Sequence, residues 1–218
     1  DRDFNMDLEL AERALTPRTG ALIATSIFGQ PVDLEALDGL RRRHPDLVVI
    51  QDCAHSFGAR WKGRPVQREG AAAVYGLNIS KILTSIFGGI ITTDSDDLIS
   101  AMRRLRDERV RPASPLKAFR RRFYLVASSL ALWPPVYGLV HRLERAGLLD
   151  PFVKYYDEGR IDMPEDYLEA MTGLEARVGH VQAGRYESIL ASRRAAADRY
   201  YSLLEETPGL RLPPRNEG

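Results

Sequence analysis

The sequence predicts an α/β protein whose mostly parallel sheet is covered by helices on both faces. Short apolar segments alternate with segments of helical periodicity, the pattern of a parallel sheet joined by helical crossovers. Segment 47–51 is apolar at successive positions and lacks the alternation of a strand with one solvated face. The chain has 218 residues, 44 % hydrophobic and 28 % charged, so it can bury a core and has an ordinary globular composition.

Caps and breakers justify the first elements. Residues 7–14 fit one or two helical turns that end before Pro17, because the residue preceding a proline is pushed out of the helical region. Segment 21–26 is short and apolar and is a candidate buried strand. Asp33 is placed to cap a helix over 34–43, in which leucines recur every three residues and three arginines close the last turn.

The central region continues the alternation. The predicted elements are, in order, a strand at 47–51, a polar loop at 58–70, strands at 72–75 and 90–93, and a helix from Asp94 or Ser95 to about residue 110. This order completes the α/β part of the chain.

We expect three parts: an α/β part at 1–111, an apolar and basic helical insertion at 112–164, and a part at 165–218 dominated by a long helix over 166–206. The chain begins with Asp1 rather than methionine. We therefore expect it to be the central part of a longer polypeptide, truncated at both ends.

The insertion combines an apolar run at 123–140 with basic flanks. The run is about long enough to span a bilayer as one helix, but Pro134 and Pro135 interrupt its middle. Three interpretations stay open. The insertion packs on the protein or on a dimer partner, it forms a helical hairpin at an anionic membrane surface through residues 117–149, or it spans a membrane.

Composition excludes several classes of function. The net charge of +1 gives no basic field for nucleic acid. The single cysteine, Cys53, forbids an internal disulfide framework and favours a cytoplasmic location, and no secretory signal is visible. No histidine pair has the spacing of a metal site, so we expect no metal, and no GxGxxG follows a predicted strand.

One carboxylate and one amine carry the chemical prediction. Asp52 follows a predicted buried strand, at the edge where open α/β sheets bind ligands. Lys81 precedes an uncharged run at 82–89, so we expect its amine to be desolvated and therefore nucleophilic toward a carbonyl. Alone, Asp52 would be a cap, His55 a polar residue and Lys81 a surface amine. Together they could hold a pyridine ring, as in pyridoxal phosphate enzymes.

The central motifs resemble those of a known family. They include Asp52-Cys53-Ala54-His55, Gly58-Ala59, Ala73-Val74-Tyr75-Gly76-Leu77-Asn78-Ile79-Ser80-Lys81 and Gly88-Gly89. This block is similar to the DegT/DnrJ/EryC1/StrS sugar aminotransferases, and weaker similarity covers residues near 7–31 and 191–200. The resemblance implies the large domain of a fold-type I pyridoxal 5'-phosphate (PLP) enzyme.

The resemblance also implies roles for individual residues. Asp52 would pair with the pyridine nitrogen, Ala54 would pack on the ring, and His55 would bond its phenolic oxygen. Lys81 would attach the cofactor covalently and then move a proton as the general base. The reaction would move an amino group, from glutamate, to a keto group on a nucleotide-linked sugar, in a homodimer.

One departure concerns the cofactor phosphate. The family places a serine five residues before the lysine, and here that position is Gly76. Asn78 or Ser80 could compensate by binding the phosphate. Gly76 also keeps open an alternative, a non-catalytic homologue with a regulatory or membrane-surface role.

Overall fold

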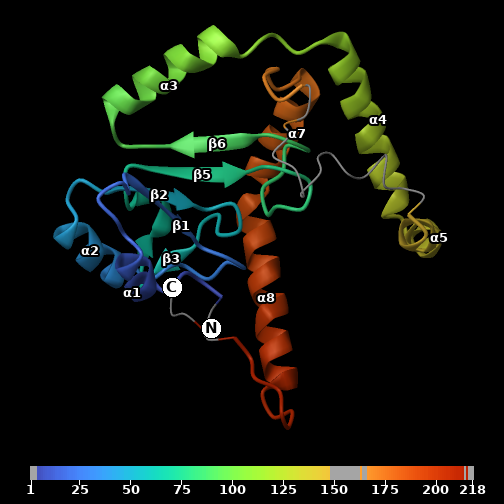
Figure 1. The fold of residues 1–218 in the computed structure, drawn as a ribbon. Coiled ribbons are helices and arrows are strands. Elements are labelled where there is room, and N and C mark those ends of the chain that lie inside the picture. The colour runs from blue at the N-terminus through green and yellow to red at the C-terminus, as the bar shows by residue number, and fades with distance from the viewer. Residues whose placement is uncertain (1–3, 148–162, 164–165, 214, 216–218) are drawn as a thin grey trace. The chain divides into compact units, whose positions relative to one another are not determined.

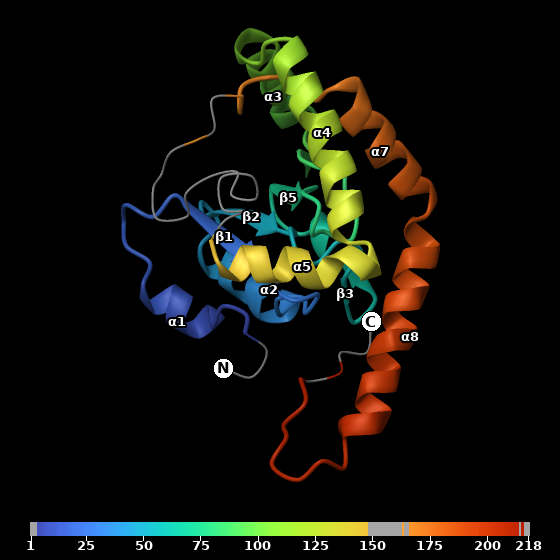
Figure 2. The same ribbon diagram turned by 90° about the vertical axis from the view of Figure 1, so that its right-hand side faces the viewer.

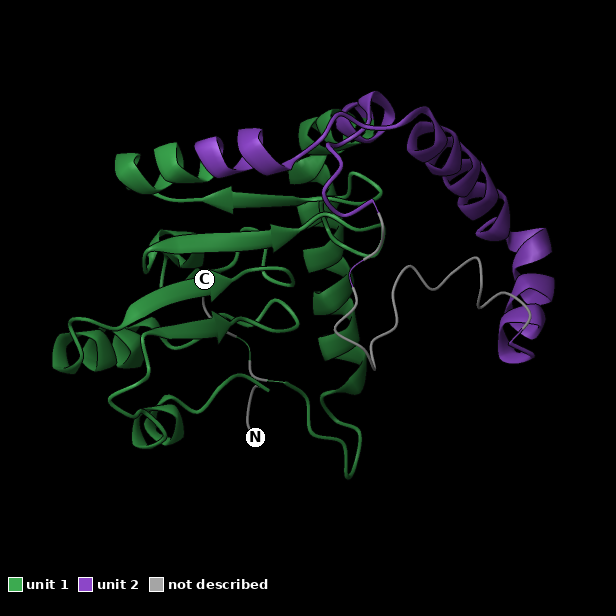
Figure 3. Ribbon diagram, turned by 45° about the horizontal axis from the view of Figure 1, so that its top comes forward, with its two compact units in different colours: residues 1–102, 178–218 green, residues 103–177 purple. Residues whose placement is uncertain are grey.

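The computed structural model describes residues 4–147, 163, 166–213 and 215. The chain forms two compact units, residues 1–102 with 178–218, and residues 103–177 (Figure 3). This division follows compactness, and the three parts predicted from the sequence remain a prediction.

A four-stranded sheet organises the first unit (Figure 1). Its strands are β1 (Ala21–Thr25), β2 (Val48–Asp52), β5 (Ala72–Gly76) and β6 (Gly89–Thr92), in the order β1-β2-β5-β6. The first three are parallel and β6 is antiparallel to β5. The prediction of a mostly parallel sheet is confirmed, as are all four strands to within one or two residues.

Two capped helices follow the predicted pattern. In α1 (Leu8–Arg13) the Asp7 carboxylate accepts from two backbone N–H groups of the first turn. In α2 (Leu34–Arg43) Asp33 does the same, and all three leucines predicted to face the core are buried. The cap fixes where α2 begins, and its three-residue periodicity fixes which side packs on the sheet.

The core lies on one face of the sheet. Its buried residues come from α1, α2, the three parallel strands, the segment before α2 and the segment after β2; they are Leu8, Ala24, Val32, Leu34, Leu37, Val49, Cys53, Val66, Ala73 and Tyr75. The register puts Ile23, Ile50, Val74 and Ile91 on the opposite face. Of these, Ile23, Val74 and Ile91 are exposed in the described part of the chain.

The segment predicted as a polar loop at 58–70 contains a small hairpin. β3 (Arg60–Trp61) and β4 (Arg64–Pro65) pair antiparallel and lead into a 3-10 turn, η1 (Val66–Arg68). Lys62 and Gly63 join them with φ of 47° and 80°. Two consecutive positive φ values are typical of a tight two-residue hairpin turn. The dipeptide Lys-Gly predicts such a turn less strongly than Asn-Gly does.

The remaining helices are α3 (Asp96–Arg109), α4 (Pro115–Ala131), α5 (Pro134–Arg145), α7 (Gly173–Gly184) and α8 (Tyr186–Leu204). Ser95 caps α3, since its Oγ accepts from the backbone N–H of Leu98 at 3.2 Å. The prolines separate α4 from α5, which are bent by 108° relative to one another (Figure 2).

The prediction of one continuous helix over 166–206 is wrong. The helical stretch begins only after Thr172 and is interrupted at Arg185. Thr172 and Glu175 form a reciprocal capping box: the Thr172 Oγ1 accepts from the Glu175 N–H, and the Glu175 carboxylate accepts from the Thr172 N–H. Gly184, a poor helix former, stands at the interruption.

Candidate active site

A pocket of about 430 Å³ lies in the first unit, at the carboxyl ends of the three parallel strands. Its lining residues are Phe28 and Gly29 after β1, Ala54, His55 and Phe57 after β2, Gly76 at the end of β5, Ser80, Lys81, Ile82 and Leu83 beyond it, and Arg193 of α8. Parallel strands of an open sheet present their ligands at this edge. The sequence prediction placed the site at the same edge.

Lys81 lies in the loop between β5 and β6 and is half-buried. Its backbone N–H donates to the carbonyl of Asn78 at 3.0 Å. Its Cε lies 3.5 Å from the point that a Cβ on Gly76 would occupy. The amine is therefore carried past the end of β5 into the pocket, and it is less enclosed than the sequence predicted.

Two backbone hydrogen bonds hold the base of the loop that carries Lys81. The Leu77 N–H donates to the carbonyl of Gly88, and the Ser85 N–H donates to the carbonyl of Leu77, both at 2.9 Å. Ile86 is buried with φ of 76°, a left-handed conformation that is strained for a β-branched residue. Such strain persists only where the surroundings hold it, so the packing around the buried Ile86 must hold this part of the loop in place.

Asp52 ends β2 and shares a side of the sheet with Lys81. Its Cα is in register with Val74, two residues before Gly76, so the side chains of Asp52 and Val74 and the Cβ direction of Gly76 share one face. Lys81 lies beside that Cβ position. A carboxylate and an amine are thus brought to the same face and the same edge.

The Asp52 carboxylate is held by its neighbours. Its Oδ1 accepts from the Ala54 N–H at 3.0 Å, and its Oδ2 accepts from the Thr25 hydroxyl at 3.4 Å. The first of these bonds also orders the turn that carries Ala54 and His55. Ala54 lies 3.7 Å from the Gly76 Cβ position, and the exposed His55 ring is tilted against Phe28.

Asn78 and Ser80 form a local turn beside Lys81. The Asn78 Oδ1 accepts from both the N–H and the hydroxyl of Ser80, at 3.2 Å and 2.7 Å. Ser80 lines the pocket, whereas Asn78 and Asp52 are not among its lining residues. Asn78 is therefore the residue that orients Ser80.

Two positively charged side chains, Lys81 and Arg193, line the pocket together with His55, and no carboxylate is among its described lining residues. Such a pocket suits an anionic ligand. Arg193 was not predicted as a site residue, although its segment belongs to the family resemblance. A lone arginine on a helical pattern carries no signal that it faces a site more than 100 residues earlier in the chain.

Tyr186 fastens the first turn of α8 to the pocket wall. Its hydroxyl donates to the carbonyl of Phe57 at 3.3 Å, and the two rings meet with centroids 5.2 Å apart. Burial raises the pKa of Tyr186 above its ordinary value, so the hydroxyl stays protonated and able to donate. Arg193 follows two turns later on the same helix.

Cys53 lies outside the pocket, in the core on the other face. Burial raises the pKa of its thiol and, more strongly, the pKa of the Tyr75 phenol beside it. Both groups are neutral near pH 7, and they belong to the packing of the sheet.

The residues present fit a PLP-type cofactor. An amine is available for covalent attachment, a carboxylate lies on the same face, and the positive lining suits a phosphate. Gly76 supplies no hydroxyl at the position beside Lys81, although a Cβ there would meet only ordinary contacts with Lys81 and Ala54. The pocket therefore has the chemical groups for the ring and offers Ser80 and Arg193 toward an anion.

Residues 1–123 match the DegT/DnrJ/EryC1/StrS aminotransferase family. GDP-perosamine synthase of Caulobacter vibrioides is 29 % identical over 199 residues, which cover 91 % of this chain and 42 % of that protein. L-glutamine:scyllo-inosose aminotransferase of Streptomyces griseus is 40 % identical over 114 residues, 52 % of this chain and 27 % of that protein.

The fold has matches among solved structures. The sugar aminotransferase CalS13 from Micromonospora echinospora superposes with a TM-score of 0.65 at 22 % identity, over 99 % of this chain and 49 % of that chain. The chain spans less than half the length of the proteins it matches.

Proposed function

Because this chain belongs to the DegT/DnrJ/EryC1/StrS aminotransferase family, we propose that the protein is a PLP-dependent aminotransferase acting on a keto group of a nucleotide-linked sugar. One observation carries the proposal. Lys81 projects into a pocket at the carboxyl ends of β2 and β5, on the same side of the sheet as Asp52.

Each site residue predicted from the sequence has a role in this proposal. Lys81 attaches the cofactor, Asp52 pairs with the pyridine nitrogen, and Ala54 packs on the ring. His55 bonds the phenolic oxygen, and Ser80, oriented by Asn78, binds the phosphate. When bound, the cofactor supplies an electron-withdrawing ring that stabilises negative charge on the substrate carbon.

The chain's own groups supply the proton transfer and the electrostatics. The Lys81 amine would act as the general base that takes the proton from the substrate carbon and moves it across the nitrogen in a 1,3-transfer. Asp52, held by hydrogen bonds from Ala54 and Thr25, would direct its carboxylate toward the pyridine nitrogen. Arg193 adds positive charge for an anionic group of the substrate.

The amino donor and the acceptor are the finer part of the proposal. We propose glutamate as donor. The name of the Streptomyces griseus relative specifies L-glutamine and scyllo-inosose, and that of the Caulobacter relative specifies a GDP-linked product. Parallel assays with both donors, and with nucleotide-linked and free keto sugars, would distinguish these substrates.

Substitution of Lys81 tests the function. The Lys81→Ala protein should lose amino transfer by at least about a thousandfold, because the attachment point and the base are removed together. Lys62→Ala is the matched control, since Lys62 is an exposed lysine whose ion pair with Glu35 lies outside the pocket. Equal activity of the Lys81→Ala and wild-type proteins would overturn the assignment.

Gly76 supports a second candidate, a non-catalytic homologue with a regulatory role. The absent hydroxyl removes one phosphate contact that the family resemblance predicts. A purified full-length protein that stays colourless with excess PLP would favour this candidate. A yellow protein that turns over amino donor would exclude it.

Assembly and location complete the proposal. We propose that the protein is a cytoplasmic homodimer, with each active site completed by the neighbouring subunit. Light scattering on the purified protein checks the dimer, since a monomer that retains full activity would contradict it.

A further inference from the structure

Helix α4, in the second unit, has its amphipathic character inverted. A surface helix ordinarily buries an apolar stripe and exposes its charges. In α4 the buried residues are Lys117 and Arg121, whereas Phe119 and Phe123 are exposed by 66 % and 60 %. The apolar stripe of this helix therefore lacks a covering element in the described part of the chain.

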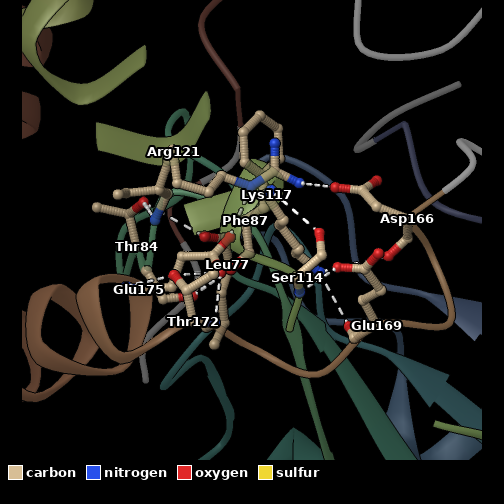
Figure 4. Close-up of polar contacts among 12 residues, drawn as sticks. Leu77, Thr84, Phe87, Ser114, Lys117, Arg121, Asp166, Glu169, Thr172 and Glu175 are labelled. Carbon is tan, nitrogen blue, oxygen red and sulfur yellow. Dashed lines mark hydrogen bonds and ion pairs between the residues drawn. The ribbon is translucent and has the colours of Figure 1, made fainter. Parts of the chain in front are cut away.

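The charged face is held by a specific polar network (Figure 4). Arg121 pairs with Glu175 at 2.9 Å and with Asp166 at 2.7 Å. Lys117 Nζ donates to the backbone carbonyls of Asp166 and Glu169. Buried charges are tolerated only when they are paired in this way. The network thus fixes which side of α4 faces inward and presents the opposite side outward.

The outward side is a continuous stripe. Its residues recur at alternating spacings of three and four, which places them on one side of the helix; they are Leu116, Phe119, Phe123, Val126 and Leu130, all exposed. Trp133 continues the spacing at the bend, and Tyr137 and Leu139 follow in α5. Helical periodicity puts Arg120 and Arg122 on the two flanks of the stripe.

The charge around the stripe is mostly positive. In α4 and α5, the exposed charged residues are four arginines and one acid: Arg120, Arg122, Arg142, Arg145 and Glu144. No described helix is by itself long and apolar enough to cross a membrane. The two helices together pass that test of length and composition only as a pair bent by 108°.

We propose that α4 and α5 bind the surface of an anionic lipid bilayer. The apolar stripe would enter the boundary between headgroups and acyl chains, and the flanking arginines would contact lipid phosphates. The bend would keep both helices near the surface. A second copy of this chain is disfavoured as the occupant, because two such faces would bring arginines against arginines. An anionic surface complements the charge and covers the apolar residues.

Flotation with defined vesicles tests this proposal on the full protein. Vesicles of phosphatidylcholine with about one third phosphatidylserine should carry the protein upward, and binding should weaken as salt is raised. The double variant Phe119→Ser/Phe123→Ser should bind at least about tenfold more weakly. Arg120→Glu/Arg122→Glu should lose the preference for these anionic vesicles over vesicles of phosphatidylcholine alone. If the wild-type protein binds neither kind of vesicle, the proposal is overturned.

The matched control is Tyr200→Ser/Leu203→Ser, two residues of α8 exposed by 66 % and 67 %. This variant should float like the wild type. If this control variant and Phe119→Ser/Phe123→Ser lose vesicle binding equally, the binding is non-specific and the proposal of a specific surface is refuted. A double variant of α4 that turns a dimer into monomers, with no vesicle binding by the wild type, would assign the stripe to self-association.

Trp133 offers a readout without substitution of the stripe. It is exposed at the bend, and the sequence has only one other tryptophan, the partly buried Trp61. Brominated lipids should quench the Trp133 emission and leave the Trp61 emission unchanged, with Trp61→Phe identifying the component. An unquenched Trp133 in vesicle-bound protein would contradict insertion of this helix pair.

Discussion

Replacing Arg121 by methionine should strongly destabilise the second unit. The Arg121 side chain is 6 % exposed and faces Glu175, which is 2 % exposed. Methionine fills much of the volume but leaves a desolvated carboxylate without its cation. Removing one member of a buried ion pair costs about 3–5 kcal/mol. We expect a loss of that size in the free energy of unfolding.

The other members of the network should behave differently. Glu175→Gln leaves Arg121 beside Asp166, so we expect a smaller loss of about 1.5–3 kcal/mol. The double replacement Arg121→Met/Glu175→Leu removes both buried charges and should be less harmful than Arg121→Met alone. The double variant still loses the capping box at Thr172, so its free energy of unfolding should be about 1 kcal/mol lower than that of the wild type.

Urea unfolding followed by circular dichroism and tryptophan fluorescence measures these differences. Arg120→Met is the control, because Arg120 is exposed on the same helix and should change stability by no more than about 0.5 kcal/mol. If the free energy of unfolding of Arg121→Met lies within about 1 kcal/mol of the wild-type value, the buried pair does not orient α4.

Three further predictions concern the first unit. Gly76→Ser should tighten PLP binding about tenfold, because a Cβ meets only ordinary contacts there and the new hydroxyl can donate a hydrogen bond to a phosphate. Absorbance titration measures the affinity, and an unchanged affinity would place the phosphate elsewhere. Gly70→Ala should lower the urea midpoint, with a loss of about 1–3 kcal/mol, since φ is +91° and the new Cβ would lie 2.6 Å from the Val49 carbonyl; an unchanged midpoint would refute the clash. The hydrogen bond from Arg43 lowers the pKa of Glu12 from 4.5 to about 2, so its stabilisation is complete above pH 4.5 and disappears as pH falls toward about 2. Thermal melting across that range should show a shallower pH dependence in Glu12→Gln, and equal slopes would contradict the lowered pKa.

The sheet and the main site were predictable because their signals are local. Asp33 and the three leucines of α2 specify a cap and a face, and the apolar segments specify strands. Asp52 ends β2 and Lys81 lies in the loop after β5, so the parallel direction of the two strands brings both residues to one edge.

Features that depend on distant contacts were not predictable. Arg193 reaches the pocket through the packing of α8, fixed by Tyr186 on Phe57, which no periodicity encodes. The inverted face of α4 depends on Glu175, whose partner Arg121 is 54 residues away in the sequence. The interruption at Arg185 was missed because apolar spacing continues across it.

Peptide mass spectrometry after borohydride reduction of the PLP-treated protein would identify the lysine that holds the cofactor. The sequence offers four lysines, Lys62, Lys81, Lys117 and Lys154. We expect a pyridoxyl adduct on Lys81, with the other three lysines unmodified at equimolar PLP. An adduct on another lysine, or none on any, would contradict this expectation.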